Sequence, residues 1–534
     1  MSFAMRRPET MRERAGQCVM ARIGSNLPPT TSVDADANRV RRLLERCPLG
    51  GLILFRGAHP AAAEVLADLQ RVSRFPLLVG ADIERGVGQQ VRGGTVFPHA
   101  QALGATDRPE DAVALLARAT AREARACGIH WAFAPVADVN TCAENPIIGI
   151  RAFGEDAPRV SRCVRAYVRA ARDEGLLTTA KHFPGHGRTA VDSHETTPVV
   201  DADHDALQRI DLPPFQAAID AGVDAVMTAH VAYPALDPEA RPATGSPPIL
   251  RDRLRREMGF DGVVVSDSLL MEGGPGRERP PGEQAAALLN AGVDLLLDPD
   301  DPEAVVDGLV AAVANGSLAA SRLDAAWRRV WRLKVRLRKQ WGDAAFAPVP
   351  GDLEAKAHRS AADALARQAV RVHATPDASW PLPPSRVERG GTLHVVALTP
   401  RANADALGPY AEALRSTYPA VRYDALPAER ASAQYDAVRA AALDAEHLVL
   451  VGAVEPAAWH AFGLRREQQA WMRRLAASRA VVVAALGSPH ILQAAPDAPD
   501  TSVHLCTYST VPASQRALVA CMAGRDAPPR VPPQ

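Results

Sequence analysis

The 534-residue sequence predicts an α/β fold with a parallel (β/α)8 TIM-type barrel followed by a smaller three-layer α/β sandwich domain. Two observations predict the barrel: short apolar runs without strict alternation recur through the first two-thirds of the chain, and amphipathic helical stretches separate them. A third predicts the sandwich, because a second series of apolar runs begins only after a Pro-rich segment. We therefore expect a catalytic barrel domain at 1–340, a helical and Pro-rich linker at 341–390, and the sandwich at 391–534.

The strands of the barrel are expected at seven apolar runs: GGLILF (50–55, the expected first strand), PLLVGAD (76–82), WAFAPVADV (131–139), LLTTAKHF (176–183), AVMTAH (225–230), GVVVSDS (262–268) and DLLLDP (294–299). Continuous apolar runs of this kind are typical of parallel strands that are buried on both faces. The clearest helix between them places Val160, Cys163, Val164, Tyr167 and Val168 on one face. Strand–helix alternation over about 330 residues favours a closed barrel over an open sheet.

Polar residues stand at the carboxyl ends of these runs: Asp82, Asp138, Lys181–His182, His230, Asp267 and Asp298. Active sites of (β/α)8 barrels lie at that end of the strands, so these side chains are expected to share one site. A single Asp in this position is equally well explained as the cap of the following helix. Capping is a weaker explanation for six strands together.

The sandwich domain is expected to hold a second, smaller parallel sheet. Its strands correspond to TLHVVALTP (392–400), AVRYDAL (420–426), HLVLVGA (447–453), AVVVAAL (480–486) and SVHLCTY (502–508). Helical segments alternate with these runs, which is typical of an open α/β sheet with helices on both faces.

Composition excludes several classes of function. Lys and Arg total 61 and Asp and Glu total 61, so the balance gives no general attraction to nucleic acid or to anionic membranes. No run of about 18 apolar residues predicts a membrane helix, and no apolar stretch follows the basic N-terminal residues as in a secretory signal. Seven scattered cysteines without a C-x-x-C pair predict neither disulfides nor structural zinc. We expect a cytoplasmic protein without metal or cofactor; the oligomeric state stays open.

Lysine is rare in this chain, since only four of the 61 basic residues are Lys. Lys181 is the only lysine among the first 333 residues. It opens the densest polar segment, KHFPGHGRTAVDSH (181–194), in which Pro184 and Gly185 exclude a regular helix. Asp192 and His194 are two residues apart, so in extended backbone they point the same way. A carboxylate beside an imidazole makes a general acid/base, although a loop histidine capped by a nearby Asp gives the same pattern.

A second centre is GFDGVVVSDSLLMEG (259–273), in which an apolar strand ends at Asp267. A carboxylate in this position can act as a nucleophile or a metal ligand, and helix capping explains it equally well. These motifs resemble glycoside hydrolase family 3, in its β-N-acetylhexosaminidase branch. The resemblance extends over residues 45–300 and includes GADIERG (80–86), NPIIGIRAFGEDA (145–157) and AVMTAHVAYPALD (225–237). ALGSPHIL (485–492) resembles the second domain of two-domain members.

The resemblance implies a role for each matching residue. Asp267 would be the nucleophile, and His194 the general acid/base with Asp192 as its partner. The residues that would bind the sugar or line its pocket are Asp82, Arg151, Lys181, His182, His230 and Met271. The chain departs from the family pattern at Arg188 and Ser268, where Asp is usual, at Ala152, where Ser is usual, and in ERGVGQQVR (84–92).

The function implied is a retaining, exo-acting glycosidase that removes terminal β-linked N-acetylglucosamine, with cell-wall fragments as a possible carbohydrate substrate. A phosphorylase with the same residues, in which phosphate replaces water, is one alternative. A metal hydrolase using His182, His186, His194 and Asp267 is another, although Pro184 and Gly185 interrupt the spacing that a metal-binding helix needs. A carbohydrate-binding homologue with impaired catalysis is the non-enzymatic alternative.

Overall fold

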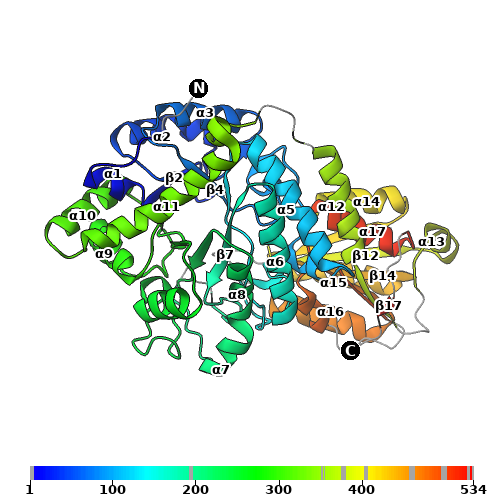
Figure 1. The fold of residues 1–534 in the computed structure, drawn as a ribbon. Helices are drawn as coiled ribbons and strands as arrows, with labels where there is room; N and C mark the ends of the chain where they lie inside the picture. Colours follow the sequence, from blue (N-terminus) through cyan, green and yellow to red (C-terminus); the bar gives the residue numbers. More distant parts are fainter. Residues whose placement is uncertain are drawn as a thin grey trace. The chain divides into compact units, whose positions relative to one another are not determined.

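The computed structural model describes residues 5–191, 196–349, 353, 355–374, 380–401, 407–455, 463–494, 502–525 and 530–531. The chain forms two compact units (Figure 1). The barrel unit comprises residues 1–96, 113–141 and 154–358, and the sandwich unit comprises 97–112, 142–153 and 359–534. Two short segments from the first third of the chain thus belong to the second unit, and each unit is described by itself.

Among the described residues of the barrel unit, eight parallel strands lie in the order β10-β1-β2-β4-β6-β7-β8-β9. A parallel bridge between Val265 and Leu295 brings β9 beside β10 and closes the barrel, which confirms the predicted fold class. The strands are β1 (Val19–Ile23), β2 (Gly51–Leu54), β4 (Leu78–Ala81), β6 (Trp131–Ala132), β7 (Leu177–Phe183), β8 (Ala225–Thr228), β9 (Val263–Val265) and β10 (Leu296–Leu297). A small separate pair joins β3 (Gly57–Ala58) to β5 (Val91–Arg92).

One barrel strand was not predicted, and this corrects the numbering of the others. GGLILF is the second strand, because β1 precedes it and pairs in parallel with both β2 and β10. Arg22 interrupts the apolar run of β1, so the segment does not read as a buried strand. The arginine is accommodated because its side chain binds Asp298 at the carboxyl end of the barrel.

Helices cover the outside of the barrel between successive strands (Figure 1). They are α1 (Met11–Gly16), α2 (Val33–Arg46), α3 (Ala61–Val72), α5 (Pro109–Ala126), α6 (Ala157–Asp173), α7 (His204–Ala206), α8 (Pro213–Asp220), α9 (Pro281–Ala291), α10 (Pro302–Ala314) and α11 (Ala320–Trp341), with π-helical segments at Leu207–Asp211 and Pro248–Glu257. In α6 the Asp156 side chain caps the first turn by accepting from Arg159 N, and the predicted apolar face is buried.

Helix α11 is fastened to the amino-terminal end of the barrel by arginines that repeat every seven residues. Arg322 and Arg329 both bind the buried carboxylate of Asp294, at 3.0 and 3.2 Å. Arg336, one repeat later, binds Asp224, which precedes β8. Because seven residues are about two helical turns, the three arginines lie on one face. This face neutralises two carboxylates that the barrel buries opposite its active end.

Lys334 lies on the same helix and is fully buried, in contrast to an ordinary lysine. Its Nζ donates to Gln17 Oε1 at 2.5 Å and lies 5.5 Å from the centre of the Trp331 ring. Burial lowers the pKa of Lys334 to about 7. The amine is therefore largely uncharged above neutral pH in the folded protein, whereas it is charged in the unfolded chain.

Replacing Lys334 with methionine is expected to flatten the pH dependence of stability between pH 7 and pH 9. A lysine whose pKa is depressed by folding binds more protons in the unfolded state over this range, so wild-type stability rises with pH, by up to about 1.4 kcal/mol per pH unit. Urea unfolding followed by tryptophan fluorescence at pH 7.5 and 9 measures the difference. The exposed Lys339→Met variant should keep the wild-type slope. Equal slopes for the wild type and Lys334→Met would contradict the assignment.

Within the described part of the sandwich unit, seven strands lie in the order β13-β12-β14-β15-β16-β11-β17. They are β11 (Arg371–Ala374), β12 (Leu393–Thr399), β13 (Arg422–Pro427), β14 (His447–Val454), β15 (Val482–Gly487), β16 (Val503–Cys506) and β17 (Arg530–Val531). The five predicted strands, β12 to β16, are present and parallel to one another. The two others were not predicted, and β11 runs antiparallel to β16.

Helices form the outer layers of the sandwich: α4 (Ala100–Gly104), α12 (Ala355–Ala369), α13 (Pro384–Gly390), α14 (Gly408–Thr417), α15 (Ser432–Asp444), α16 (Arg466–Ser478) and α17 (Pro512–Met522). One face of the sheet packs Val396, Leu450 and Val483 against Trp471 and other apolar residues of α15 and α16. Successive side chains of a strand point to opposite faces, and the alternate residues are buried too, so the sheet is covered on both sides.

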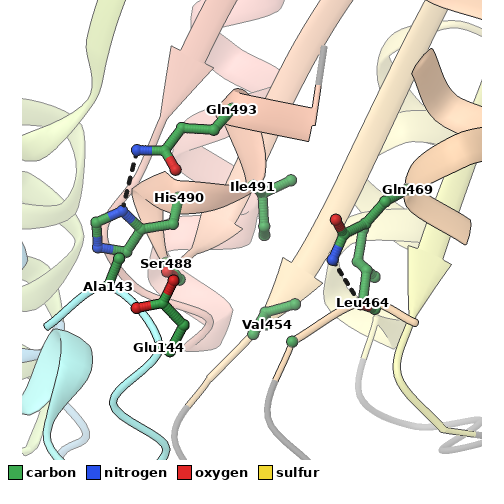
Figure 2. Close-up of a pocket in the computed structure, with 10 residues that line it drawn as sticks. Ala143, Glu144, Val454, Leu464, Gln469, Ser488, His490, Ile491 and Gln493 are labelled. Atoms are coloured by element: carbon green, nitrogen blue, oxygen red, sulfur yellow. Dashed lines mark hydrogen bonds between the residues drawn. The ribbon is translucent and has the colours of Figure 1, made fainter. Parts of the chain in front are cut away.

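A hollow of about 340 Å³ lies in the sandwich unit at the carboxyl ends of β14 and β15 (Figure 2). Gly487 adopts a left-handed conformation there, and a Cβ on it would meet the Val454 carbonyl. This close approach lets Ser488 N donate to the same carbonyl at 3.0 Å. The motif ALGSPHIL therefore forms a tight turn that sets the wall of the hollow. The lining residues are Ala143, Glu144, Val454, Gly463, Leu464, Gln469, Ser488, His490, Ile491 and Gln493.

Candidate active site

The candidate site lies at the carboxyl ends of the barrel strands, where the sequence analysis places it. Strand β7 carries Lys181–His182 in its last three residues, and strands β4, β6, β8, β9 and β10 precede Asp82, Asp138, His230, Asp267 and Asp298, respectively. Because the strands are parallel and the barrel is closed, these residues lie at the same end of the barrel. The structure thus assembles polar groups from segments that are far apart in the sequence.

Lys181 is held between two carboxylates. Its Nζ lies 2.7 Å from Asp82 Oδ1 and 2.7 Å from Glu84 Oε1, and its side chain is only 2% exposed. Asp82 remains 31% exposed, so its carboxylate is accessible to a ligand. An ammonium shared by two carboxylates leaves an excess of negative charge and fixes the orientation of the acceptors. Such an arrangement suits the binding of hydroxyl groups, which donate to carboxylates.

Asp138 organises the start of the loop that follows β7. This fully buried carboxylate accepts hydrogen bonds from the backbone N–H groups of His182 (3.2 Å) and His186 (2.7 Å). Its Oδ2 atom also lies 2.8 Å from His182 Nδ1. A carboxylate beside Nδ1 favours the tautomer that carries the proton there. In that tautomer the Nε2 atom is a hydrogen-bond acceptor.

His186 lies next to His182, with the two ring centres 5.9 Å apart in an edge-to-face arrangement. Its Nδ1 is 2.8 Å from Thr189 Oγ1. Burial, together with the charge of His182, lowers the pKa of His186 to about 4, although the negative charges of Asp138 and Asp267 oppose this shift. His186 is therefore neutral at physiological pH, and it lies within the electrostatic range of Asp267.

The two glycines of the segment KHFPGHG stand where the backbone packs too closely against its neighbours for a larger side chain. A Cβ on Gly187 would overlap the Val139 carbonyl, and one on Gly185, which has a φ of +136°, would meet the Asp211 side chain. Asp211 is buried and binds Arg188 Nε at 2.7 Å. Burial raises the pKa of Asp211 to about 6, against the opposing effect of Arg188. The unusual Arg188 is thus the ion-pair partner of a buried carboxylate.

Asp267 follows β9 and is partly exposed. Its Oδ1 accepts a hydrogen bond from Ser268 N at 2.8 Å. Ser268 in turn donates its hydroxyl to Asp298 Oδ2 at 2.9 Å. Arg22 binds both oxygens of Asp298, through Nε at 2.7 Å and Nη2 at 2.5 Å.

His230 and Met271 both make contacts in the turn that follows Asp267. His230 is fully buried, with Nδ1 2.8 Å from Thr244 Oγ1 and Nε2 3.2 Å from the Ser268 carbonyl. Met271 is buried, and its carbonyl accepts from Gly274 N at 3.0 Å. Both residues therefore stabilise the turn that follows β9.

Three of the predicted site residues lie outside the described residues of the barrel unit. Asp192 and His194 lie outside the described residues. Arg151 belongs to the sandwich unit, where its Nη1 donates to the Ile147 carbonyl at 2.9 Å. In the same segment Asn145 Oδ1 accepts from the backbone of Ile147 and Ile148, which shapes the turn before Arg151.

The structure adds Glu84 and Arg22, which sequence reasoning missed, and it gives specific partners to Asp138 and Asp298, which were expected only as strand-end residues. Asp138 and Asp298 stand at strand ends, but nothing in their sequence context distinguishes them from helix caps. Glu84 lies in a segment that departs from the family pattern, and Arg22 lies in the strand that was not predicted. Their roles depend on partners in distant strands, so no local pattern reveals them.

The described residues contain no group of three or more His, Cys, Asp or Glu side chains that could hold a metal ion. In the same part of the chain, none of the helices has the length and apolar character needed to span a bilayer.

Comparison with known proteins identifies relatives that match a little more than half of the chain. The β-hexosaminidase of Stenotrophomonas maltophilia strain K279a is 39% identical over 293 residues, which cover 53% of this chain and 85% of that protein. β-Hexosaminidase A of Pseudoalteromonas piscicida is 33% identical over 365 residues, which cover 62% of this chain and 59% of that protein. The β-N-acetylglucosaminidase/β-glucosidase of Cellulomonas fimi is similar over 52% of its own length. The chain thus spans little more than half of these last two relatives.

Solved structures match almost the whole chain. A family 3 β-N-acetylglucosaminidase from Paenibacillus sp. str. FPU-7 superimposes with a TM-score of 0.82 at 28% identity, covering 97% of this chain and 98% of that one. The β-glucoside phosphorylase BglX has the same fold, with a TM-score of 0.81 at 21% identity. The model of the glycosyl hydrolase family 3 N-terminal domain matches residues 10–333. The resemblance seen in the sequence is therefore confirmed, and the chain belongs to glycosyl hydrolase family 3.

Proposed function

We propose that this protein is a retaining, exo-acting glycosidase that removes terminal β-linked N-acetylglucosamine. The observation that carries the proposal is the carboxylate of Asp267, partly exposed at the active end of the barrel and fixed by Ser268 N. The β-hexosaminidase from S. maltophilia, which matches over 85% of its length, supports the choice of substrate.

In the proposed mechanism Asp267 attacks the anomeric carbon and forms a glycosyl-enzyme intermediate, which water then hydrolyses with net retention. His194, paired with Asp192, protonates the leaving oxygen and later activates water. This assignment rests on the sequence motif, since both residues lie outside the described part of the chain. A histidine suits both steps because its ordinary pKa is near neutral.

Sugar hydroxyls would bind to the acceptors around Lys181. The partly exposed Asp82 carboxylate, which shares the Lys181 ammonium with Glu84, offers oxygens that hydroxyls can approach. His182, fixed by Asp138, adds the acceptor Nε2. For Arg151, the family motif alone suggests a role in sugar binding. Fragments of cell-wall glycan, which carry terminal N-acetylglucosamine, are a fitting natural substrate.

Replacing Lys181 with arginine is expected to lower kcat/KM by about 10²-fold, although the charge is kept. The ammonium is a compact donor enclosed by two carboxylates at 2.7 Å, and a planar guanidinium cannot occupy the same space. Steady-state kinetics on an aryl β-N-acetylglucosaminide measure the loss. Lys339→Arg, at an exposed position of α11, is the control and should behave as wild type. Near-normal kinetics of Lys181→Arg would remove Lys181 from the sugar-binding group.

One comparison tests the proposed function. The purified protein is incubated with aryl β-N-acetylglucosaminide and with aryl β-glucoside, each with and without inorganic phosphate. Faster release from the N-acetylglucosaminide, with free sugar as the product in both buffers, is the expected result. Sugar 1-phosphate formed in phosphate would identify a phosphorylase. Binding of N-acetylglucosamine without turnover of either glycoside would identify a carbohydrate-binding homologue.

A further inference from the structure

We propose that Arg22, Asp298 and Ser268 act as a positioning relay that orients the carboxylate of Asp267 for attack. The proposal rests on the proposed function, in which Asp267 is the nucleophile. It adds a role for three residues that are not themselves expected to touch the sugar and that come from the ends of three different strands, β1, β9 and β10.

Ser268 is the centre of this relay because each of its polar groups is engaged by a different element. Its N–H donates to Asp267 Oδ1, and its hydroxyl donates to Asp298 Oδ2. Its carbonyl lies 3.2 Å from His230 Nε2, and it accepts a hydrogen bond from that nitrogen when the imidazole carries its proton at Nε2. The residue is thus held from three directions. One oxygen of Asp267 is tied to a backbone position that cannot shift without breaking the other two contacts.

Asp298 is fixed just as firmly. It is buried and adopts a left-handed conformation with a φ of +58°, which is uncommon for a residue other than glycine. Arg22 binds both of its oxygens, which is the strongest geometry for a carboxylate–guanidinium pair. Arg22 also donates to Ser25 Oγ at 3.0 Å and lies over the Phe55 ring. The guanidinium is therefore also held by Ser25, shortly after β1, and by Phe55, which follows β2.

The relay also explains why serine stands at 268, where the resembled family usually has a second Asp. With the buried Asp298 carboxylate 2.9 Å from the Ser268 hydroxyl, a carboxylate at 268 would face another carboxylate at a partly buried position. A hydroxyl instead supplies the donor that Asp298 Oδ2 accepts. The hydroxyl at position 268 is therefore matched to the carboxylate of Asp298, which in turn is matched to the guanidinium of Arg22.

The test is a set of variants measured on aryl β-N-acetylglucosaminide. Ser268→Ala is expected to lower kcat by about 10- to 100-fold while KM changes less than threefold, because substrate binding is untouched. Ser268→Thr keeps the hydroxyl and should stay within about fivefold of wild type. Ser266→Ala is the matched control, since Ser266 flanks Asp267 on the other side and its hydroxyl accepts from Leu297 N instead. Its kcat should remain within about threefold.

A second measurement separates positioning from general damage. A 2-fluoro glycosyl donor labels the nucleophile, so its inactivation rate constant reports attack alone. In Ser268→Ala and in Asp298→Asn this constant should fall by the same factor as kcat, with the donor's dissociation constant unchanged. A Ser268→Ala enzyme that is labelled at the wild-type rate would overturn the relay while leaving the proposed function intact. If wild-type enzyme is not labelled at Asp267, the proposed function fails first.

The Ser268→Asp variant tests whether a second carboxylate beside Asp298 lowers the activity further. This variant should be slower than Ser268→Ala, because two carboxylates then face each other. Combining it with Asp298→Asn should recover activity relative to Ser268→Asp alone. Purely additive losses in the double variant would overturn the coupling between the two positions.

Discussion

An Asp267→Ala variant is expected to lose nearly all turnover, with kcat/KM falling by about 10⁴-fold or more. Asp267 is the carboxylate to which the proposed chemistry assigns the covalent bond, and alanine offers no nucleophile. Steady-state assays on an aryl β-N-acetylglucosaminide with a good leaving group measure the loss. The melting temperature should stay close to that of the wild type, because Asp267 is partly exposed.

Azide provides the matching rescue experiment. A small anion can enter the space left by the carboxylate and attack from the same face. The product should then be a glycosyl azide of inverted configuration, formed only by the alanine variant. Labelling of another residue by a 2-fluoro donor in the wild type would assign the nucleophile elsewhere.

An Asp138→Ala variant should be the second most damaging substitution, with kcat/KM reduced by about 10²- to 10³-fold. Asp138 accepts from the backbone of both His182 and His186 and from the His182 ring. Removing it leaves these donors without their acceptor in a buried setting, at a cost of about 1–3 kcal/mol for each one. We therefore expect a lower melting temperature together with the loss of activity.

The control for this variant is Asp173→Ala, which removes an exposed carboxylate at the end of α6 and should change neither property. Asp138→Asn is expected to fall between the two, because the amide keeps one acceptor oxygen but places its NH₂ near donors. Wild-type kinetics in Asp138→Ala would show that the loop after β7 does not depend on this carboxylate.

Much of the barrel could be predicted because its strands are buried on both faces. Continuous runs such as Gly51–Leu54 and Val263–Val265 leave a clear apolar signal, and seven of the eight described strands fall in the apolar segments that the sequence analysis singled out. Strand β1 lacks it because Arg22 interrupts the run, and the arginine is satisfied only by Asp298, near the other end of the barrel sequence. Strands β11 and β17, which lie together at one end of the sandwich sheet, are short and leave equally little signal.

Only those residues of the candidate site that stand at strand ends or in recognisable motifs could be predicted from the sequence. Lys181, His182, Asp82 and Asp267 were named from sequence, and the structure places them at the active end of the barrel. The sequence could not show that Glu84 shares Lys181, or that Asp138 receives three donors. Such contacts are set by which strands become neighbours, and that information is distributed over the whole barrel.

The arginine repeat of α11 sets an order for folding during synthesis. Asp224 and Asp294 leave the ribosome before Arg322, Arg329 and Arg336, which neutralise them. Until α11 emerges, closing the barrel would bury these two carboxylates while the arginines of α11 that pair with them are still missing. The nascent chain is therefore expected to keep its amino-terminal barrel end open, and α11 acts as the step that commits the barrel to its final form.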